Sequence, residues 1–358
     1  MPFLASRFFE PVFQVFKRPW DSTTASLVYG FSHLIFVFLA FKFQSKLIIF
    51  VLAYLSANLI YSIMAFYLSY RSVKPVFKIE SSVIKNILDL AAPLGISSIF
   101  ITISNRISIL MLAWMKSDYA VGIYSAAYKF VEISSFLAAM VTAPLIPIFA
   151  EKAKAHKESI RNISSIVFES IAIVLLPLGI ICTVFSQEII TLIYGNKLLP
   201  SAEVFKILIW VCIIIFYSLL IASIVISIGV VRFAYWLGAA AAVLSTVLNY
   251  LLIPKFSYIG SAWTALICEI LLVGVTIYYG IRHLGNFFRW KIWFMTIVLN
   301  LLLYISLNQK IIDFNIYAKS LIGLLFYFFC TWKFEIIRAD VLGLFKLNRN
   351  KNTITFKN

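Results

Sequence analysis

Several charged residues lie deep inside runs that are otherwise apolar. The stretch SNRISILMLAWM (104–115) carries Asn105 and Arg106, and the next apolar run carries Lys129 and Glu132. A charge at bilayer depth costs about 2.5–3.5 kcal/mol on insertion scales, so such residues usually face a cavity or pair with one another. An arginine offers an anionic headgroup a planar fork of donors that stays charged. The residue types therefore favour anion binding.

Helical spacing gathers these residues on two neighbouring helices. Tyr124, Tyr128 and Glu132 follow the positions i, i+4 and i+8, and Lys129 precedes Glu132 by three residues, so one helix face carries a polar stripe. At a rise of 1.5 Å per residue, Arg106 is expected about 12 Å below the outer end of its helix. Lys129 and Glu132 are expected about 15 and 20 Å below the outer end of the following helix. A short connection makes the two helices antiparallel neighbours, so their polar groups can meet.

Two interpretations of this group stay open. In the functional one, a polar cavity near the membrane midplane is lined by Asn105, Arg106, Tyr124, Tyr128, Lys129, Glu132 and Glu269. The candidate carboxylates for coupling to an ion are Glu132, Glu169 and Glu269. In the structural one, Lys129 and Glu132 neutralise each other, and Arg106 snorkels or pairs with a carboxylate in a static bundle.

Membrane helices must position these residues. Of the 358 residues, 62% are hydrophobic and only 13% are charged, which is more apolar surface than a soluble core of this length could bury. A bilayer core of roughly 30 Å needs about 20 apolar residues per helix, and run length favours helices over the short alternating strands of a barrel. The expected class is an all-α polytopic membrane helix bundle. Ten helices are predicted near 22–43, 47–70, 88–114, 119–149, 164–186, 202–228, 233–253, 258–282, 290–308 and 315–332.

The basic charge indicates orientation instead of nucleic-acid binding. The formal net charge is +16, and most of the 31 lysines and arginines fall in the amino-terminal segment, the even-numbered connections and the carboxyl-terminal tail. The positive-inside rule therefore places both termini in the cytoplasm. The same basic excess suits contact with anionic lipids of the inner leaflet, so membrane lipids are expected partners and nucleic acid is not.

Signals for catalysis are absent from the sequence. There is no GxxxxGKS/T phosphate loop, so direct ATP coupling is not expected. His33, His156 and His283 are far apart, which gives no cluster for a metal or for acid–base chemistry. The cysteines lie in apolar runs without CxxC spacing, namely Cys182, Cys212, Cys268 and Cys330. We therefore expect no cofactor, no metal and no disulfide, and we expect that the protein is not an enzyme.

Five segments resemble, in order, one family of transporters. They are FFEPVFQVFKRP (8–19), LAAPLGISSIFITISNRISILML (90–112), AVGIYSAAYKFVEISSFL (120–137), IITLIYGNKLLPSAEVFKILIW (189–210) and LNYLLIPKFSYIGSAWTAL (248–266). Their order is similar to that of the polysaccharide flippases, the O-antigen-type branch of the multidrug/oligosaccharidyl-lipid/polysaccharide exporter superfamily. The resemblance implies a bacterial inner-membrane protein that flips undecaprenyl-pyrophosphate-linked oligosaccharide for O-antigen, capsule or exopolysaccharide synthesis. It also implies H⁺ or Na⁺ as coupling ion and other glycan-assembly proteins as partners.

The resemblance further implies a MATE-like arrangement of lobes. Residues 1–80 would be the last two helices of an N-lobe with a linker, 81–285 a complete six-helix C-lobe, and 286–358 two additional helices with a basic cytoplasmic tail. About the first four helices of the family pattern have no counterpart, so a truncated gene product, a partial reading frame or a chain that needs a partner is expected. Asn105 stands where the family often has aspartate, so a coupling role for that acid does not carry over. A drug/cation antiporter of the same superfamily and a membrane enzyme of cell-envelope glycan assembly are the alternatives.

Overall fold

The computed structural model describes most of the helical part of the chain. The described residues are 13, 19–43, 47–72, 95, 99–100, 102–142, 145–146, 149, 157–227, 231–285, 288–308, 323, 325 and 327. They are helical apart from short turns, and no strand occurs among them, which confirms the predicted all-α class. The chain divides into two compact units, Met1–Ile87 and Leu88–Asn358.

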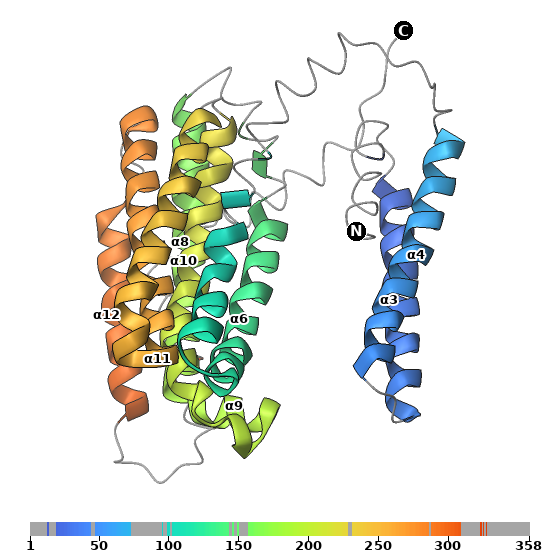
Figure 1. Ribbon diagram of the computed structural model, residues 1–358. Coiled ribbons are helices and arrows are strands. Elements are labelled where there is room, and N and C mark those ends of the chain that lie inside the picture. Colours follow the sequence, from blue (N-terminus) through green and yellow to red (C-terminus); the bar gives the residue numbers. More distant parts are fainter. Residues whose placement is uncertain are drawn as a thin grey trace, which may run out of the picture. The chain divides into compact units, whose positions relative to one another are not determined.

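The first unit contains two long helices, α3 (Pro19–Lys42) and α4 (Leu47–Ser72), which pack side by side (Figure 1). Buried alanines such as Ala25 and Ala65 lie between them, and small residues of this kind let membrane helices approach closely. Their outward faces expose leucine, isoleucine and phenylalanine side chains. A surface of this composition suits contact with lipid.

The second unit is a bundle around one central helix, α10 (Ser201–Ser227), which packs most extensively on three others. Its members are the helical residues 102–115, α6 (Asp118–Thr142), α8 (Lys157–Val184), the short α9 (Ser186–Tyr194), α11 (Val231–Leu284) and α12 (Trp290–Asn308) (Figure 1). From residue 207 to 227, α10 carries no charged residue, and a helix that is apolar on all sides belongs inside a bundle. It packs on α6, α8 and α11, while α12 packs on α8.

The long element α11 is two helices joined by a sharp reversal. Ser257 has φ 52° and ψ −132° inside it, which is not helical. A Cβ added to Gly260 would lie 2.5 Å from the carbonyl oxygen of Leu252, although residues eight apart are about 12 Å apart in a continuous helix. The chain therefore turns back on itself here, and glycine is required because two backbones meet. The two halves correspond to the predicted helices 233–253 and 258–282.

Some boundaries differ from the prediction. α8 begins at Lys157 instead of 164, because its first turns are amphipathic and bury Ile160 and Ile163 instead of forming an apolar run. α9 lies in the connection left between the predicted helices 164–186 and 202–228. The predicted helix 315–332 lies outside the described residues except at 323, 325 and 327.

Five of the described helices are long and apolar enough to cross a membrane by length and composition, namely α3, α4, α8, α10 and α11, with the two halves of α11 counted together. The polar residues of α6 lower its mean hydropathy, so α6 is not one of the five. Among the polar residues that lower the hydropathy of α6 are residues that line the cavity described below.

Candidate functional site

A cavity of about 550 Å³ opens among the helical residues 102–115, α6, α10 and α11. Its wall is polar for the interior of a membrane bundle, with hydroxyl groups from Ser104, Ser108, Ser135, Ser218, Ser245 and Thr264. Six of the seven residues predicted from the sequence line it, namely Asn105, Arg106, Tyr124, Tyr128, Glu132 and Glu269. Lys129 is not among the lining residues and reaches the site through Glu132.

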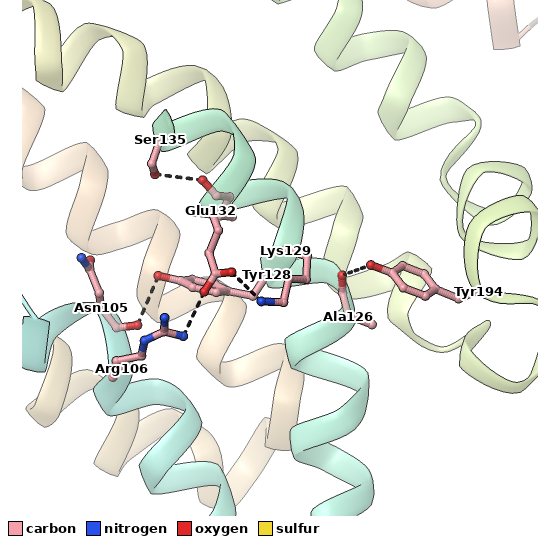
Figure 2. Close-up of polar contacts among 9 residues, drawn as sticks. Asn105, Arg106, Ala126, Tyr128, Lys129, Glu132, Ser135 and Tyr194 are labelled. Carbon is pink, nitrogen blue, oxygen red and sulfur yellow. Dashed lines mark hydrogen bonds and ion pairs between the residues drawn. The ribbon is translucent and has the colours of Figure 1, made fainter. Parts of the chain in front are cut away.

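Glu132 is the centre of the charged group. One of its oxygens, Oε1, lies 2.9 Å from Nη1 of Arg106, and the other, Oε2, accepts a hydrogen bond of 2.7 Å from Nζ of Lys129. Figure 2 shows the carboxylate between the two cations, with the ring of Tyr128 beside it. Arg106 comes from one helix and Lys129 from the next, so the carboxylate joins both helices. The group carries one net positive charge when all three side chains are ionised.

The two tyrosines of α6 support this group. Tyr124 is buried and stacks on Tyr128, with ring centroids 5.5 Å apart. The hydroxyl of Tyr128 donates a hydrogen bond of 3.2 Å to the backbone carbonyl of Asn105 (Figure 2). This bond holds the neighbouring helix one residue before Arg106, which fixes the height of the guanidinium relative to Glu132. Asn105 therefore contributes its carbonyl to this contact, while its side chain is exposed.

Glu269 lies on the second half of α11 and has a different environment. Its Oε2 accepts a hydrogen bond of 3.2 Å from the hydroxyl of Ser218 on α10. Among the residues that the structure describes, no ion pair involves Glu269. The cavity thus holds one carboxylate that is neutralised by two cations and one that is bound by a hydroxyl.

A polar contact beside the cavity was not predicted. Asn249 is fully buried in the first half of α11, where its Nδ2 donates to the hydroxyl of Ser108 at 3.0 Å and to the carbonyl of Ser245 at 2.8 Å. Ser108 and Ser245 both line the cavity. The signal was present in the sequence, since an amide inside the apolar run 237–253 needs a partner.

The structure does not bring the third candidate carboxylate, Glu169, to the cavity. Glu169 is buried on α8 and forms a bidentate ion pair with Arg289, whose Nε donates to Oε1 at 2.5 Å and whose Nη2 donates to Oε2. The hydroxyl of Ser165 donates to the same carboxylate at 3.2 Å. Its ion pair with Arg289 connects α8 to the start of α12.

Comparisons with known proteins agree with the resemblance read from the sequence motifs. Residues 3–153 match the family model of polysaccharide biosynthesis proteins, and residues 93–251 match the MatE family model. The fold is similar to that of the lipid II flippase MurJ in an inward closed conformation, with a TM-score of 0.73 and 14% sequence identity over 92% of this chain and 72% of that chain. The predicted resemblance to the polysaccharide exporters is confirmed.

The chain is also similar to the uncharacterized membrane protein MJ1068 of Methanocaldococcus jannaschii. It is 25% identical over 206 residues, which are 57% of this chain and 41% of the relative. The chain therefore spans less than half the length of that relative. At 14% identity, the similarity to the solved flippase shows a shared fold.

Proposed function

We propose that the protein translocates undecaprenyl-pyrophosphate-linked oligosaccharide from the cytoplasmic to the periplasmic leaflet of a bacterial inner membrane. The glycan would be an O-antigen, capsule or exopolysaccharide unit. One observation carries the proposal: the guanidinium of Arg106 lies at the wall of a polar cavity inside the helix bundle, where it is paired with Glu132 and still 56% exposed.

The chemistry of the substrate explains why such a residue is needed. A pyrophosphate headgroup loses its hydration when it enters the bundle, and a fixed cation in the cavity offsets that cost. Arginine can bind two phosphate oxygens at once and stays charged. The serine and threonine hydroxyls of the wall are suitable partners for sugar hydroxyls, because each can donate and accept a hydrogen bond.

The family comparisons support the substrate class. A polysaccharide biosynthesis model matches the first part of the chain, and the similar solved structure is that of a lipid II flippase. In this proposal residues 81–285 act as a six-helix lobe with two additional helices over 286–358, and both termini are cytoplasmic. Glu132 or Glu269 would couple transport to H⁺ or Na⁺, and other glycan-assembly proteins would deliver and receive the substrate.

The test is a translocation assay with the full chain. The protein is reconstituted in liposomes that contain a fluorescent undecaprenyl-pyrophosphate-linked oligosaccharide, and a membrane-impermeant quencher measures the fraction that changes leaflet. Arg106→Ala should abolish translocation, and Arg106→Lys should keep only part of it because an ammonium lacks the planar fork.

The matched control is Arg161→Ala. Arg161 lies on α8 in an exposed ion pair with Glu158 at 3.3 Å and is not among the residues that line the cavity. This variant should translocate like the wild type. Normal translocation by Arg106→Ala, or a failure of that variant to insert into the membrane, would show that Arg106 is a structural pairing residue and would refute the proposal.

A drug/cation antiporter is the second candidate, favoured by the presence of two carboxylates, Glu132 and Glu269, in one cavity. The same liposomes distinguish it. Uptake of a fluorescent lipophilic cation in exchange for protons or sodium ions that leave the liposome would favour this alternative, provided that the lipid-linked oligosaccharide does not move.

A further inference from the structure

Both cations of the site are bound to a residue of the chain itself. The two oxygens of Glu132 contact Arg106 at 2.9 Å and Lys129 at 2.7 Å, one oxygen to each cation. Neither cation is enclosed by this contact, because the side chain of Arg106 is 56% exposed and that of Lys129 is 62% exposed. An anion that enters the cavity can therefore approach the same guanidinium that Glu132 already binds.

We propose that Glu132 is an internal substitute for the phosphate groups of the substrate, and that a diphosphate binds by displacing this carboxylate from Arg106 and Lys129. The inference rests on the proposed function, since it describes how that headgroup enters and leaves. A carboxylate and a phosphate both present paired oxygens to the planar fork of an arginine. Glu132 is therefore a positioning and release residue, and Arg106 and Lys129 bind the headgroup.

The physical reason is the cost of an empty site. Two unpaired cations close together in a membrane bundle are unfavourable in the absence of substrate, and Glu132 reduces that cost by pairing with both. The same carboxylate is tethered next to the site, so it is present at high effective concentration whenever the headgroup dissociates. Competition from Glu132 lowers the affinity for the diphosphate and speeds its release into the opposite leaflet.

The contrast with Glu169 separates this arrangement from a static ion pair. Glu169 is only 4% exposed, and both of its oxygens are bound by the fork of Arg289. Glu132 is 30% exposed, lines the cavity, and has its two oxygens on two different cations. Each of these contacts is a partly exposed single ion pair of the kind worth about 0.2–1 kcal/mol by measurement on other proteins, which a multiply charged ligand can outcompete.

The experiment measures the affinity of the purified full chain in detergent for farnesyl pyrophosphate, an isoprenoid diphosphate used as the probe. Glu132→Gln keeps the shape of the side chain but removes its charge. This variant should bind the probe about two- to thirty-fold more tightly than the wild type, since two weak ion pairs no longer compete. In the liposome assay it should translocate more slowly, because release is delayed.

Two further variants serve as controls. Glu269→Gln removes one negative charge from the same cavity without touching either cation, so it should raise the affinity by clearly less than Glu132→Gln does. In the triple variant Arg106→Gln/Lys129→Gln/Glu132→Gln, restoring Glu132 should lower the affinity by no more than Glu269→Gln raises it, because there is no longer a cation pair for Glu132 to occupy. Inorganic pyrophosphate and farnesol, tested in parallel, separate binding of the diphosphate from binding of the isoprenoid chain.

The direction of the change decides the result. A structural ion pair predicts weaker binding and lower thermal stability for Glu132→Gln, and either unchanged or weaker binding of the probe would overturn the inference. If Glu132→Gln does not fold while Glu132→Asp does, the carboxylate is structural and the inference is also overturned. If the wild type does not bind the probe and Arg106→Gln changes nothing, the proposed function itself has failed.

Discussion

Replacing Arg289 with alanine should destabilise the junction of α8 and α12 much more than any exposed ion pair does. The guanidinium of Arg289 binds both oxygens of Glu169, and the backbone carbonyl of Arg289 accepts hydrogen bonds from the amides of Ile292 and Trp293 in the first turn of α12. Its side chain therefore fixes the start of α12 to α8. The aromatic side chains of Phe288 and Trp293 pack against Phe168 of α8 in the neighbouring apolar cluster.

The size of the effect follows from burial. Glu169 is 4% exposed, and in the variant the contact that remains among those described is the hydroxyl of Ser165. Removing one partner of a buried ion pair costs about 3–5 kcal/mol, because the other charge stays buried without compensation. Arg289 is 34% exposed, so some of its charge is already solvated, and we expect about 2–4 kcal/mol.

The assay compares two arginine variants whose carboxylate partners, Glu158 and Glu169, both lie on α8. Arg161→Ala removes the exposed pair with Glu158 and should change the free energy of unfolding in detergent by about 0.5 kcal/mol or less. Arg289→Ala should lower it by several times that amount. Hydrogen exchange should rise in α12 (Trp290–Asn308) before it rises in α10, since α12 is the helix that the pair anchors.

A double variant tests the cause. Glu169→Met/Arg289→Met removes both charges and leaves apolar side chains of similar length, so it should recover most of the lost stability. If Arg289→Ala costs no more than Arg161→Ala, or if the double variant is as unstable as the single one, the buried pair does not hold α12 to α8 and the reasoning is wrong.

Three further predictions concern the turn, the buried amide and the topology. Gly260→Val should prevent the reversal within α11 and abolish folded protein in fluorescence size-exclusion chromatography, whereas Gly274→Ala, which has no atom within 4 Å of the added Cβ, should not. Asn249→Leu should lower the free energy of unfolding by about 1–3 kcal/mol, because the Ser108 hydroxyl beside the cavity loses the amide that donates to it; an unchanged melting temperature would contradict this. A cysteine that replaces Lys116 should react with a membrane-impermeant maleimide from outside the cell, and one that replaces Lys154 should react only after permeabilisation. Labelling of intact cells at position 154 would refute the assigned orientation.

Most of the helices could be predicted because lipid leaves few alternatives. A backbone in hydrocarbon must satisfy its own hydrogen bonds, so a long apolar run is a helix, as in α3 and α10. The first turns of α8 and the short α9 were missed because they are amphipathic and have no such run. The reversal inside α11 was predicted correctly, because the apolar sequence is interrupted near Pro254 between the two predicted helices.

The site could be predicted where spacing along one helix determines proximity. Tyr124, Tyr128 and Glu132 share a face of α6, so their meeting with Arg106 required only a short connection between neighbouring helices. The contact of Asn249 with Ser108 joins residues 141 positions apart, and that of Glu169 with Arg289 joins residues 120 positions apart. No local periodicity relates such pairs, so the role of Glu169 could not be read from its position alone.

The second unit uses the same two chemical groups, carboxylate and guanidinium, in two ways that differ in access. At Glu169 one arginine binds both oxygens of a buried carboxylate. Glu132 lies at the wall of a cavity, and its two oxygens are divided between two cations, Arg106 and Lys129, whose side chains are both more than half exposed. Since the strength of an ion pair rises with burial and with bidentate geometry, the first arrangement is stable against exchange and the second is open to it. Under the proposed function both kinds of pair are needed, because firm pairs keep the helices together while weak pairs would let a charged headgroup bind and leave. In that proposal, burial of the carboxylate distinguishes the two kinds of pair.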